Sequence, residues 1–205
     1  MANITTSQAK AQYDRIVKDG WLAYFKDSAA FYGLPVEILI AIGSRETNLI
    51  NEIGDNGRGF SLMQIDIGSF PKWCESGVWR QVDQAIAKGA SVLTDKIKAV
   101  MGLQGKRIIC RHGEFIADSN IPDTDVMKIA IAAYNCGEAN ALYGYSKSAI
   151  DMLTTGHDYS GDVLDRAAMF KAFITGGSSS GQQSVPATGN DAGDAPSPGG
   201  DTPGV

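Results

Sequence analysis

The sequence is poor in the residues that metal sites and disulfide scaffolds require. Its 205 residues include two histidines and three cysteines. Cys74, Cys110 and Cys136 form no CxxC pair and fit no zinc spacing, so a metal site is poorly supplied. Two cysteine states stay open, one disulfide with a free thiol or no disulfide. Cys74–Cys110 is the pair we expect if a disulfide forms, because both residues lie in expected loops.

Long apolar runs and excess positive charge are also missing. No apolar run approaches the roughly 18 residues of a membrane helix, so we expect no membrane span. The first twenty residues lack the basic start and apolar core of a signal peptide. The formal net charge of −5 argues against nucleic acid as a partner, because phosphate binding needs a basic face.

Composition divides the chain into two parts. Residues 1–175 have the apolar content and length of one domain with a sizeable core. Residues 176–205 consist mainly of Gly, Ser, Pro, Asp and Thr. That composition is typical of a flexible tail or linker.

Apolar spacing and capping residues predict a mostly helical α+β domain. Glycines at 51–59 predict tight turns, and 60–67 is short and extended in character, so a small hairpin-like sheet is expected there. The sequence of residues 102–122 predicts a long irregular insert. The expected helices are 7–18 with Ser7 as its cap, Trp21–Tyr32, 36–46 after Pro35, 78–101, one from Asp123 or Thr124 through Ala133, and 160–173.

Glu46 is the first candidate for chemistry. Leu39, Ile42 and Glu46 share one face of the expected 36–46 helix, so a carboxyl group ends an apolar stripe. Burial there would raise its pKa and let it stay protonated near neutral pH, as a general acid must. The alternative is an ordinary ion pair with Arg45 or another basic residue at the helix end.

A glycosidase needs a second carboxylate across the bond that it cleaves, and Asp55 and Asp66 are candidates. If 60–66 is extended, side-chain alternation places Gln64 and Asp66 on one face, where both could reach one ligand. The alternatives are structural. Asp55 could serve only its turn, and Asp66 could cap Ser69.

Two further groups carry polar or reactive side chains. Tyr134 and Asn135 end an alanine-rich helix and could line a sugar site, although such a tyrosine more often packs in a core. Cys136 could be the nucleophile of a cysteine hydrolase, which needs a base to activate the thiol. No motif places His112 or His157 for that role.

Several motifs then follow one another in a specific order. They are Ser44-Arg45-Glu46-Thr47, Gly54-Asp55, the run from Gly59 to Asp66, Ala133-Tyr134-Asn135-Cys136-Gly137, and the run from His157 to Val163. Over roughly residues 10–173 this series closely resembles the goose-type lysozymes. The Ala-Tyr-Asn motif alone is shared with the lytic transglycosylases.

The resemblance implies an α+β lysozyme-like fold with a small antiparallel sheet at the cleft. It also implies cleavage of the β-1,4 bond between N-acetylmuramic acid and N-acetylglucosamine, without a cofactor. By position, Glu46 matches the general acid, and Asp55 and Asp66 match the acidic pair that activates water, which indicates inversion. The matching residues near the substrate cleft are Gln64, Tyr134, Asn135 and Tyr159.

The same resemblance implies partners and a location. Peptidoglycan glycan strands are the expected substrate, a proteinaceous lysozyme inhibitor is a candidate partner, and we expect a monomer in an extracellular or cell-wall-facing place. Two alternatives stay open, a lytic transglycosylase giving anhydromuramic products and a module that binds peptidoglycan without cleaving it. The chain also departs from the family, with Phe70 where a histidine is common and with the Cys136 thiol near the cleft.

Overall fold

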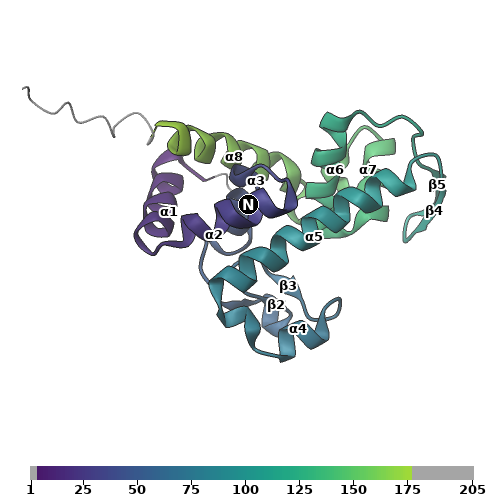
Figure 1. Ribbon diagram of the computed structural model, residues 1–205. Coiled ribbons are helices and arrows are strands. Elements are labelled where there is room, and N and C mark those ends of the chain that lie inside the picture. The colour runs from purple at the N-terminus through teal and green to yellow at the C-terminus, as the bar shows by residue number, and fades with distance from the viewer. Residues whose placement is uncertain (1–3, 177–205) are drawn as a thin grey trace, which may run out of the picture.

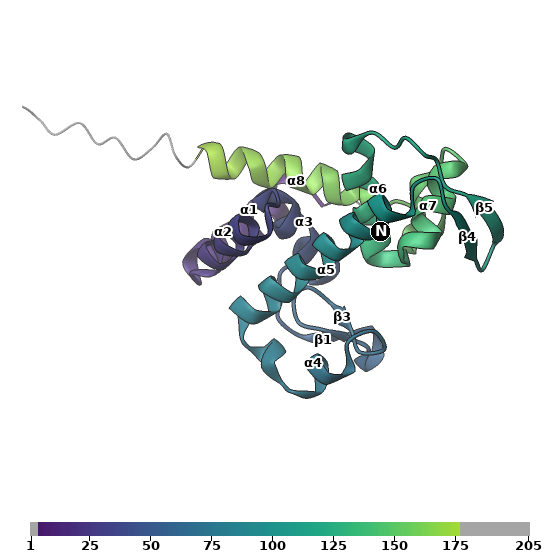
Figure 2. The same cartoon turned by 45° about the vertical axis from the view of Figure 1, so that its right-hand side comes forward.

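A computed structural model describes residues 4–176 and has the expected α+β class. Helices dominate, and Figures 1 and 2 show the long α5 running between a helical group, a small sheet and a second helical group. The eight α-helices of the described residues are α1 Thr6–Lys18, α2 Trp21–Tyr32, α3 Val36–Thr47, α4 Pro71–Glu75, α5 Val82–Leu103, α6 Asp123–Cys136, α7 Glu138–Ser146 and α8 Tyr159–Gly176. Most of the tail expected at 176–205 lies outside the described residues, so the domain boundary stays a prediction.

Two small antiparallel sheets accompany the helices. The first has the order β1-β2-β3, with Phe60 paired to both Ile53 and Ile65, and the second is the β4–β5 hairpin. The strands are β1 Ile53–Gly54, β2 Gly59–Phe60, β3 Ile65–Asp66, β4 Arg107–Cys110 and β5 Gly113–Ile116. Short 3-10 helices are η1 Asp55–Gly57, η2 Val78–Arg80, η3 Ile150–Leu153 and η4 Thr155–His157.

Helix α3 passes through the middle of the main core. Every residue from Ile38 to Arg45 is buried, which fits a helix that is apolar on nearly all sides and packs against α2, α5 and α8. Asn48 has a left-handed conformation and ends the helix. Glu46 therefore lies in the last turn, where the core meets the sheet.

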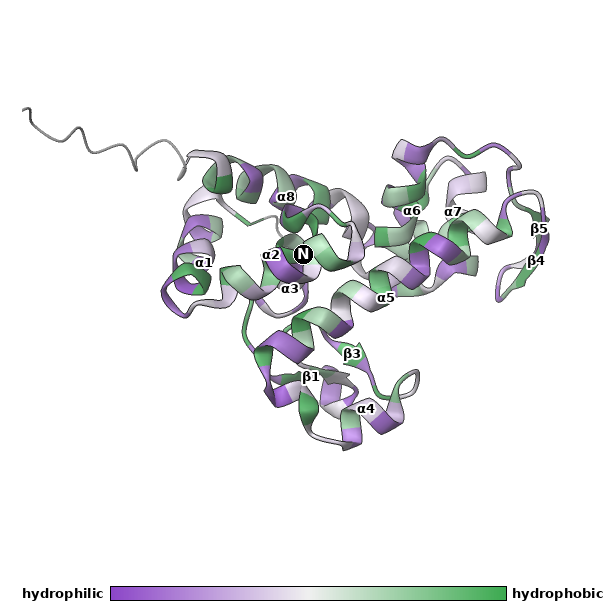
Figure 3. Ribbon diagram, viewed as in Figure 1, coloured by the Kyte–Doolittle hydropathy of each residue, from purple (hydrophilic) through white to green (hydrophobic). Residues whose placement is uncertain are grey.

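Helix α5 joins two cores. Its first half packs in the main core through residues such as Leu93, and its end packs with α6, α7 and β4 in a second core around Val100. Figure 3 shows hydrophilic and hydrophobic residues mixed along α5, as expected for a helix with one buried face. No helix within residues 4–176 is long and apolar enough to cross a membrane.

Two expected helix starts are wrong. The cap of α1 is Thr5 instead of Ser7, because Thr5 and Gln8 form a reciprocal capping box. The helix expected from residue 78 begins at Val82, since Val78–Arg80 is a 3-10 turn and Gln81 is extended.

The segment 60–67 is not one extended strand. Residues 61–64 form a turn between β2 and β3, and Ser61 and Gln64 have positive φ values of 71° and 46°. The Leu62 carbonyl in this turn accepts a hydrogen bond of 3.2 Å from Thr47 Oγ1 on α3. The alternation argument for Gln64 and Asp66 is therefore wrong.

The insert at 102–122 is more regular than expected, because it contains the β4–β5 hairpin. All three cysteines are free, so the alternative without a disulfide holds and the expected pair Cys74–Cys110 does not form. Cys74 is buried on α4, where its thiol donates to the Ile65 carbonyl. Cys110 lies in β4, and both views place β4 and α4 far apart, at opposite ends of α5.

Candidate active site

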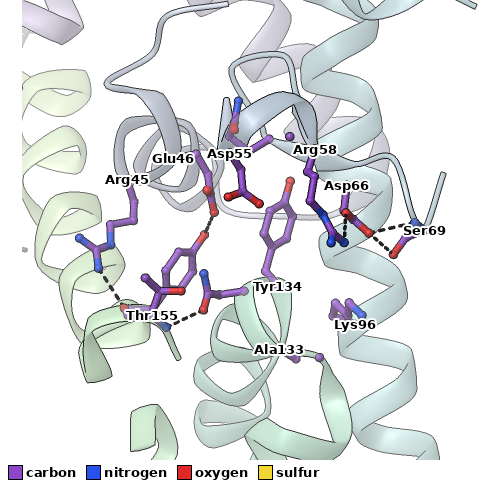
Figure 4. A pocket seen from close by; sticks show the side chains of 15 residues that line it. Arg45, Glu46, Asp55, Arg58, Asp66, Ser69, Lys96, Ala133, Tyr134 and Thr155 are labelled. Carbon is purple, nitrogen blue, oxygen red and sulfur yellow. Dashed lines mark hydrogen bonds and ion pairs between the residues drawn. The ribbon is translucent and has the colours of Figure 1, made fainter. Parts of the chain in front are cut away.

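A polar cleft lies where α3, the small sheet, α5, α6 and α8 meet (Figure 4). Its cavity volume is about 790 Å³. Two smaller hollows share residues with it, so the groove continues in two directions. The residues that line the main cleft are Arg45, Glu46, Asp55, Arg58, Gly59, Gln64, Asp66, Ser69, Lys96, Ala133, Tyr134, Asn135, Gly137, Thr155 and Tyr159.

Glu46 extends from the last turn of α3 into this cleft and accepts a hydrogen bond from the Tyr159 hydroxyl of α8. Burial raises the Glu46 pKa from 4.5 to about 7, against the opposing effects of the Tyr159 hydrogen bond and the Arg45 charge. The expected raised pKa is confirmed. A carboxyl group with this pKa can hold a proton near neutral pH and give it away.

The ion-pair alternative for Glu46 does not hold, because within residues 4–176 Glu46 forms no ion pair and Arg45 has other partners. The Arg45 guanidinium lies 2.8 Å from Asp158 Oδ1 and 3.3 Å from Asp162 Oδ2. Asp162 also accepts from Arg166 at 2.7 Å, and Arg166 donates to the Ser44 carbonyl at 3.0 Å. This buried network joins α3 to α8 and so positions Tyr159 against Glu46. Sequence reasoning missed it, although Arg45, Asp158 and Asp162 all lie within the quoted motifs.

Asp55 is held on η1 with a positive φ of 45°. Figure 4 shows its carboxylate pointing into the cleft toward Glu46 and Tyr134. Among residues 4–176 no side chain or backbone amide hydrogen-bonds to this carboxylate. A carboxylate with free oxygens can accept a proton from a water molecule.

Asp66 lines the same cleft but has several partners. Its carboxylate accepts from the Ser69 amide at 2.9 Å, from the Ser69 hydroxyl at 3.0 Å and from Arg58 at 3.2 Å. Burial alone would raise the Asp66 pKa, yet these hydrogen bonds hold it below its ordinary value. The capping interpretation of Asp66 is therefore confirmed, and its carboxylate is a weaker base than an ordinary aspartate.

Gln64 reaches the cleft through the tight turn. Its side-chain amide donates to the Ser61 carbonyl at 2.9 Å and lies close to both Gly54 and Gly59. A Cβ atom on either glycine would lie 2.2 Å from Gln64 Oε1. These glycines are therefore needed for close approach of the Gln64 amide.

Replacing Gly54 with alanine is expected to displace the Gln64 side chain while the fold survives, because the clash is with the end of a flexible side chain. We expect a loss of roughly tenfold or more in kcat/KM, because a 1 Å misplacement at a catalytic site can cost about 10²-fold. The rate of clearing of peptidoglycan, the substrate that the resemblance implies, and thermal unfolding measure both effects. In a Gln64→Ala background the added Gly54→Ala change should cost nothing further, and an additive loss would contradict this role of Gly54.

Tyr134 and Asn135 come from the last turn of α6. The Tyr134 hydroxyl donates to the Met63 carbonyl at 2.9 Å, so this tyrosine ties α6 to the sheet and also lines the cleft. Asn135 Oδ1 accepts from the Thr155 amide at 2.8 Å. The structure thus brings all seven candidate residues into one cleft. It adds Arg58, Ser69, Lys96 and Thr155, which sequence reasoning did not select.

Cys136 and Phe70 lie beside the main cleft instead of in it. Cys136 lines one adjoining hollow, where burial raises its pKa to about 11. A thiol with that pKa is protonated at neutral pH, which disfavours the cysteine hydrolase. Phe70 lines the other hollow, and the Lys88 ammonium lies 3.6 Å from its ring centroid.

A mainly helical domain with a small sheet at a polar cleft, and with a protonatable glutamate on the central buried helix, defines a lysozyme-like protein.

The Lysozyme g family model matches residues 2–173. A Lysozyme g of Takifugu rubripes is 34% identical over 142 residues, covering 66% of this chain and 65% of the relative. A Lysozyme g of Struthio camelus is 28% identical over 172 residues, covering 82% and 74%. A Lysozyme g of Gallus gallus is 31% identical over 138 residues, covering 65% and 56%.

The chain therefore belongs to the lysozyme g family, as its motifs indicated. Its matched part spans less than two thirds of the Takifugu and Gallus relatives.

Proposed function

We propose that the chain is a muramidase that hydrolyses the β-1,4 bond between N-acetylmuramic acid and N-acetylglucosamine in peptidoglycan with inversion. Family membership supports this activity. The observation that carries the proposal is Glu46, a carboxyl group with a pKa of about 7, in a cleft that also holds two aspartates. Glycoside hydrolysis by inversion needs one protonated and one ionised carboxyl group across the scissile bond.

In the proposed mechanism Glu46 donates its proton to the leaving glycosidic oxygen. The Tyr159 hydroxyl hydrogen-bonds to Glu46 and stabilises the carboxylate that forms. Asp55 accepts a proton from a water molecule that attacks the anomeric carbon from the opposite face. Asp66, kept ionised by Arg58 and Ser69, helps to orient that water.

The remaining candidate residues hold the glycan strand. Gln64 presents an amide, Asn135 presents an amide fixed by Thr155, and Tyr134 contributes an aromatic ring to the cleft lining. Amide groups and aromatic rings fit the acetamido, hydroxyl and pyranose surfaces of amino sugars. These roles need no cofactor.

The Tyr159→Phe variant tests the acid by its pH dependence. The hydrogen bond from Tyr159 lowers the Glu46 pKa, so its removal should raise that pKa. Activity falls as Glu46 loses its proton, so the alkaline limb of the kcat/KM profile should move to higher pH in the variant. An unchanged limb, or one that moves to lower pH, would mean that Glu46 is not the acid.

Loss of turbidity of a purified peptidoglycan suspension tests the activity itself. The chain should clear the suspension and release new reducing sugar ends in proportion. Binding to the wall without clearing would favour the alternative of a non-catalytic peptidoglycan-binding module. The two aspartates in the cleft favour hydrolysis over the reaction of a lytic transglycosylase, in which the muramic acid's own hydroxyl takes the place of water.

We further propose an extracellular or cell-wall-facing monomer, with residues 1–175 as the catalytic domain and 176–205 as a tail. A proteinaceous lysozyme inhibitor is a candidate partner, which would bind at the cleft of about 790 Å³. Size-exclusion chromatography with light scattering tests the monomer, which predicts a mass near 21.7 kDa.

A further inference from the structure

A second hollow of about 440 Å³ adjoins the main cleft, with which it shares Asn135 and Thr155. Its outer wall includes Arg111, which comes from the turn of the β4–β5 hairpin, and His157, which ends η4. Asn140 of α7 completes one side. The hollow therefore depends on the hairpin insert and lies next to Glu46 without containing it.

The charged side chains of this hollow differ from those of the main cleft. Three carboxylates and three cationic side chains line the main cleft, whereas Arg111 lines the hollow and no carboxylate does. The Cys136 thiol there stays neutral, because burial raises its pKa to about 11. Asp151, the neighbouring carboxylate that contributes to this shift, accepts from the Ser160 amide at 2.8 Å and the Ser160 hydroxyl at 2.7 Å.

Arg111 is arranged to receive an anion. Its Nε donates to His112 Nε2 at 2.8 Å, and the His112 ring stacks on Tyr143 with centroids 5.6 Å apart. The Nε edge of the Arg111 guanidinium is thus held by His112, the next residue in the hairpin turn. Within residues 4–176 its terminal nitrogens make no hydrogen bond or ion pair, and neither does the His157 imidazole. A guanidinium with two free donors matches a carboxylate.

We propose that this hollow binds a carboxylate of the peptide stem of peptidoglycan. The inference rests on the proposed function, because it concerns the same substrate. Peptidoglycan stems carry free carboxylates, while the lactyl carboxyl of muramic acid is consumed in the bond to the stem. In the main cleft Arg45 and Arg58 pair with aspartates and Lys96 pairs with Glu138. Arg111, whose terminal nitrogens have no partner within residues 4–176, is therefore the cation beside the cleft that can pair with a stem carboxylate.

The first experiment uses a free stem peptide, N-acetyl-L-Ala-γ-D-Glu-L-Lys, titrated into the full chain and followed by NMR. The Arg111→Gln variant should bind it about fivefold more weakly, the size expected for one partly exposed charge-assisted hydrogen-bonded pair. The matched control is Arg107→Gln, which removes a positive charge from the same hairpin at a residue paired with Glu114 outside the hollow. Equal binding by wild type and Arg111→Gln would overturn the proposal.

The second experiment compares glycan strands with stems and strands stripped of stems by an amidase. Arg111→Gln should lower kcat/KM about fivefold through KM on the first substrate and leave the second unchanged, with no effect of Arg107→Gln on either. Equal losses on both substrates would instead make Arg111 a glycan contact. If wild type cleaves neither substrate but binds the tripeptide through Arg111, the proposed activity fails and the anion site stands.

Discussion

Replacing Glu46 with glutamine is expected to lower kcat by about 10³-fold while leaving the fold intact. Glutamine keeps the shape of the side chain and can still accept the Tyr159 hydrogen bond, but it has no proton to give to the leaving oxygen. General acid catalysis contributes roughly 10²–10⁴-fold to such reactions. Clearing of peptidoglycan by equal amounts of wild type and variant measures the loss. Residual activity within tenfold of wild type would remove Glu46 from the mechanism.

The same variant should be more stable than wild type at alkaline pH. The folded-state pKa of Glu46 is about 7, against an ordinary value of 4.5, so the folded state binds this proton more tightly than the unfolded state does. Wild type therefore loses stability relative to Glu46→Gln as pH rises from 4.5 through 7, by at most about 3 kcal/mol. Urea unfolding at about pH 5 and pH 8 measures this difference. Parallel stability curves for the two proteins would show that Glu46 ionises as freely as in the unfolded chain.

The second large effect is expected at Asp55, where asparagine should lower kcat by about 10²-fold through loss of the proton acceptor. Asp66→Asn should cost less, about tenfold, because hydrogen bonds from Ser69 and Arg58 already hold this carboxylate and lower its basicity. Asp66 and Arg58 are both partly exposed, so loss of their ion pair should change stability by less than about 1 kcal/mol.

The order of these two effects is the informative result. Steady-state rates on one peptidoglycan preparation, with circular dichroism to verify folding, are sufficient to obtain it. A larger loss in Asp66→Asn than in Asp55→Asn would reverse the assigned roles. Added azide, a small nucleophile that needs no proton acceptor, should restore cleavage to Asp55→Asn but not to Glu46→Gln, because the acid is still required.

Much of the site could be predicted from local sequence. An apolar run that ends in Glu46 already implies a carboxyl group whose pKa is raised by burial. The structure confirms the raised pKa, and the Glu46 side chain is half-buried at the edge of the core. Tyr134, Asn135 and Tyr159 follow from motif order and lie in the cleft. Gln64 also lies in the cleft, but for a different reason than the sequence suggested. A turn with a positive φ at Gln64 directs its side chain there, and strand alternation does not.

The features that could not be predicted from the sequence depend mainly on contacts between distant segments. The network of Arg45, Asp158, Asp162 and Arg166 joins residues more than a hundred positions apart, and no local pattern indicates it. Helix α7 was missed, because only Ala141, Leu142 and Gly144 of its nine residues are buried and its apolar stripe is weak. The β4–β5 hairpin has two exposed isoleucines, Ile109 and Ile116, which blur its alternation.

The most direct test of the central claim is digestion of peptidoglycan by the wild-type chain in water labelled with heavy oxygen, followed by mass spectrometry of the released muropeptides. The mechanism predicts that each new muramic acid reducing end carries one labelled oxygen, because the attacking group is water activated by Asp55. Products that end in unlabelled anhydromuramic acid would contradict hydrolysis and make the enzyme a lytic transglycosylase.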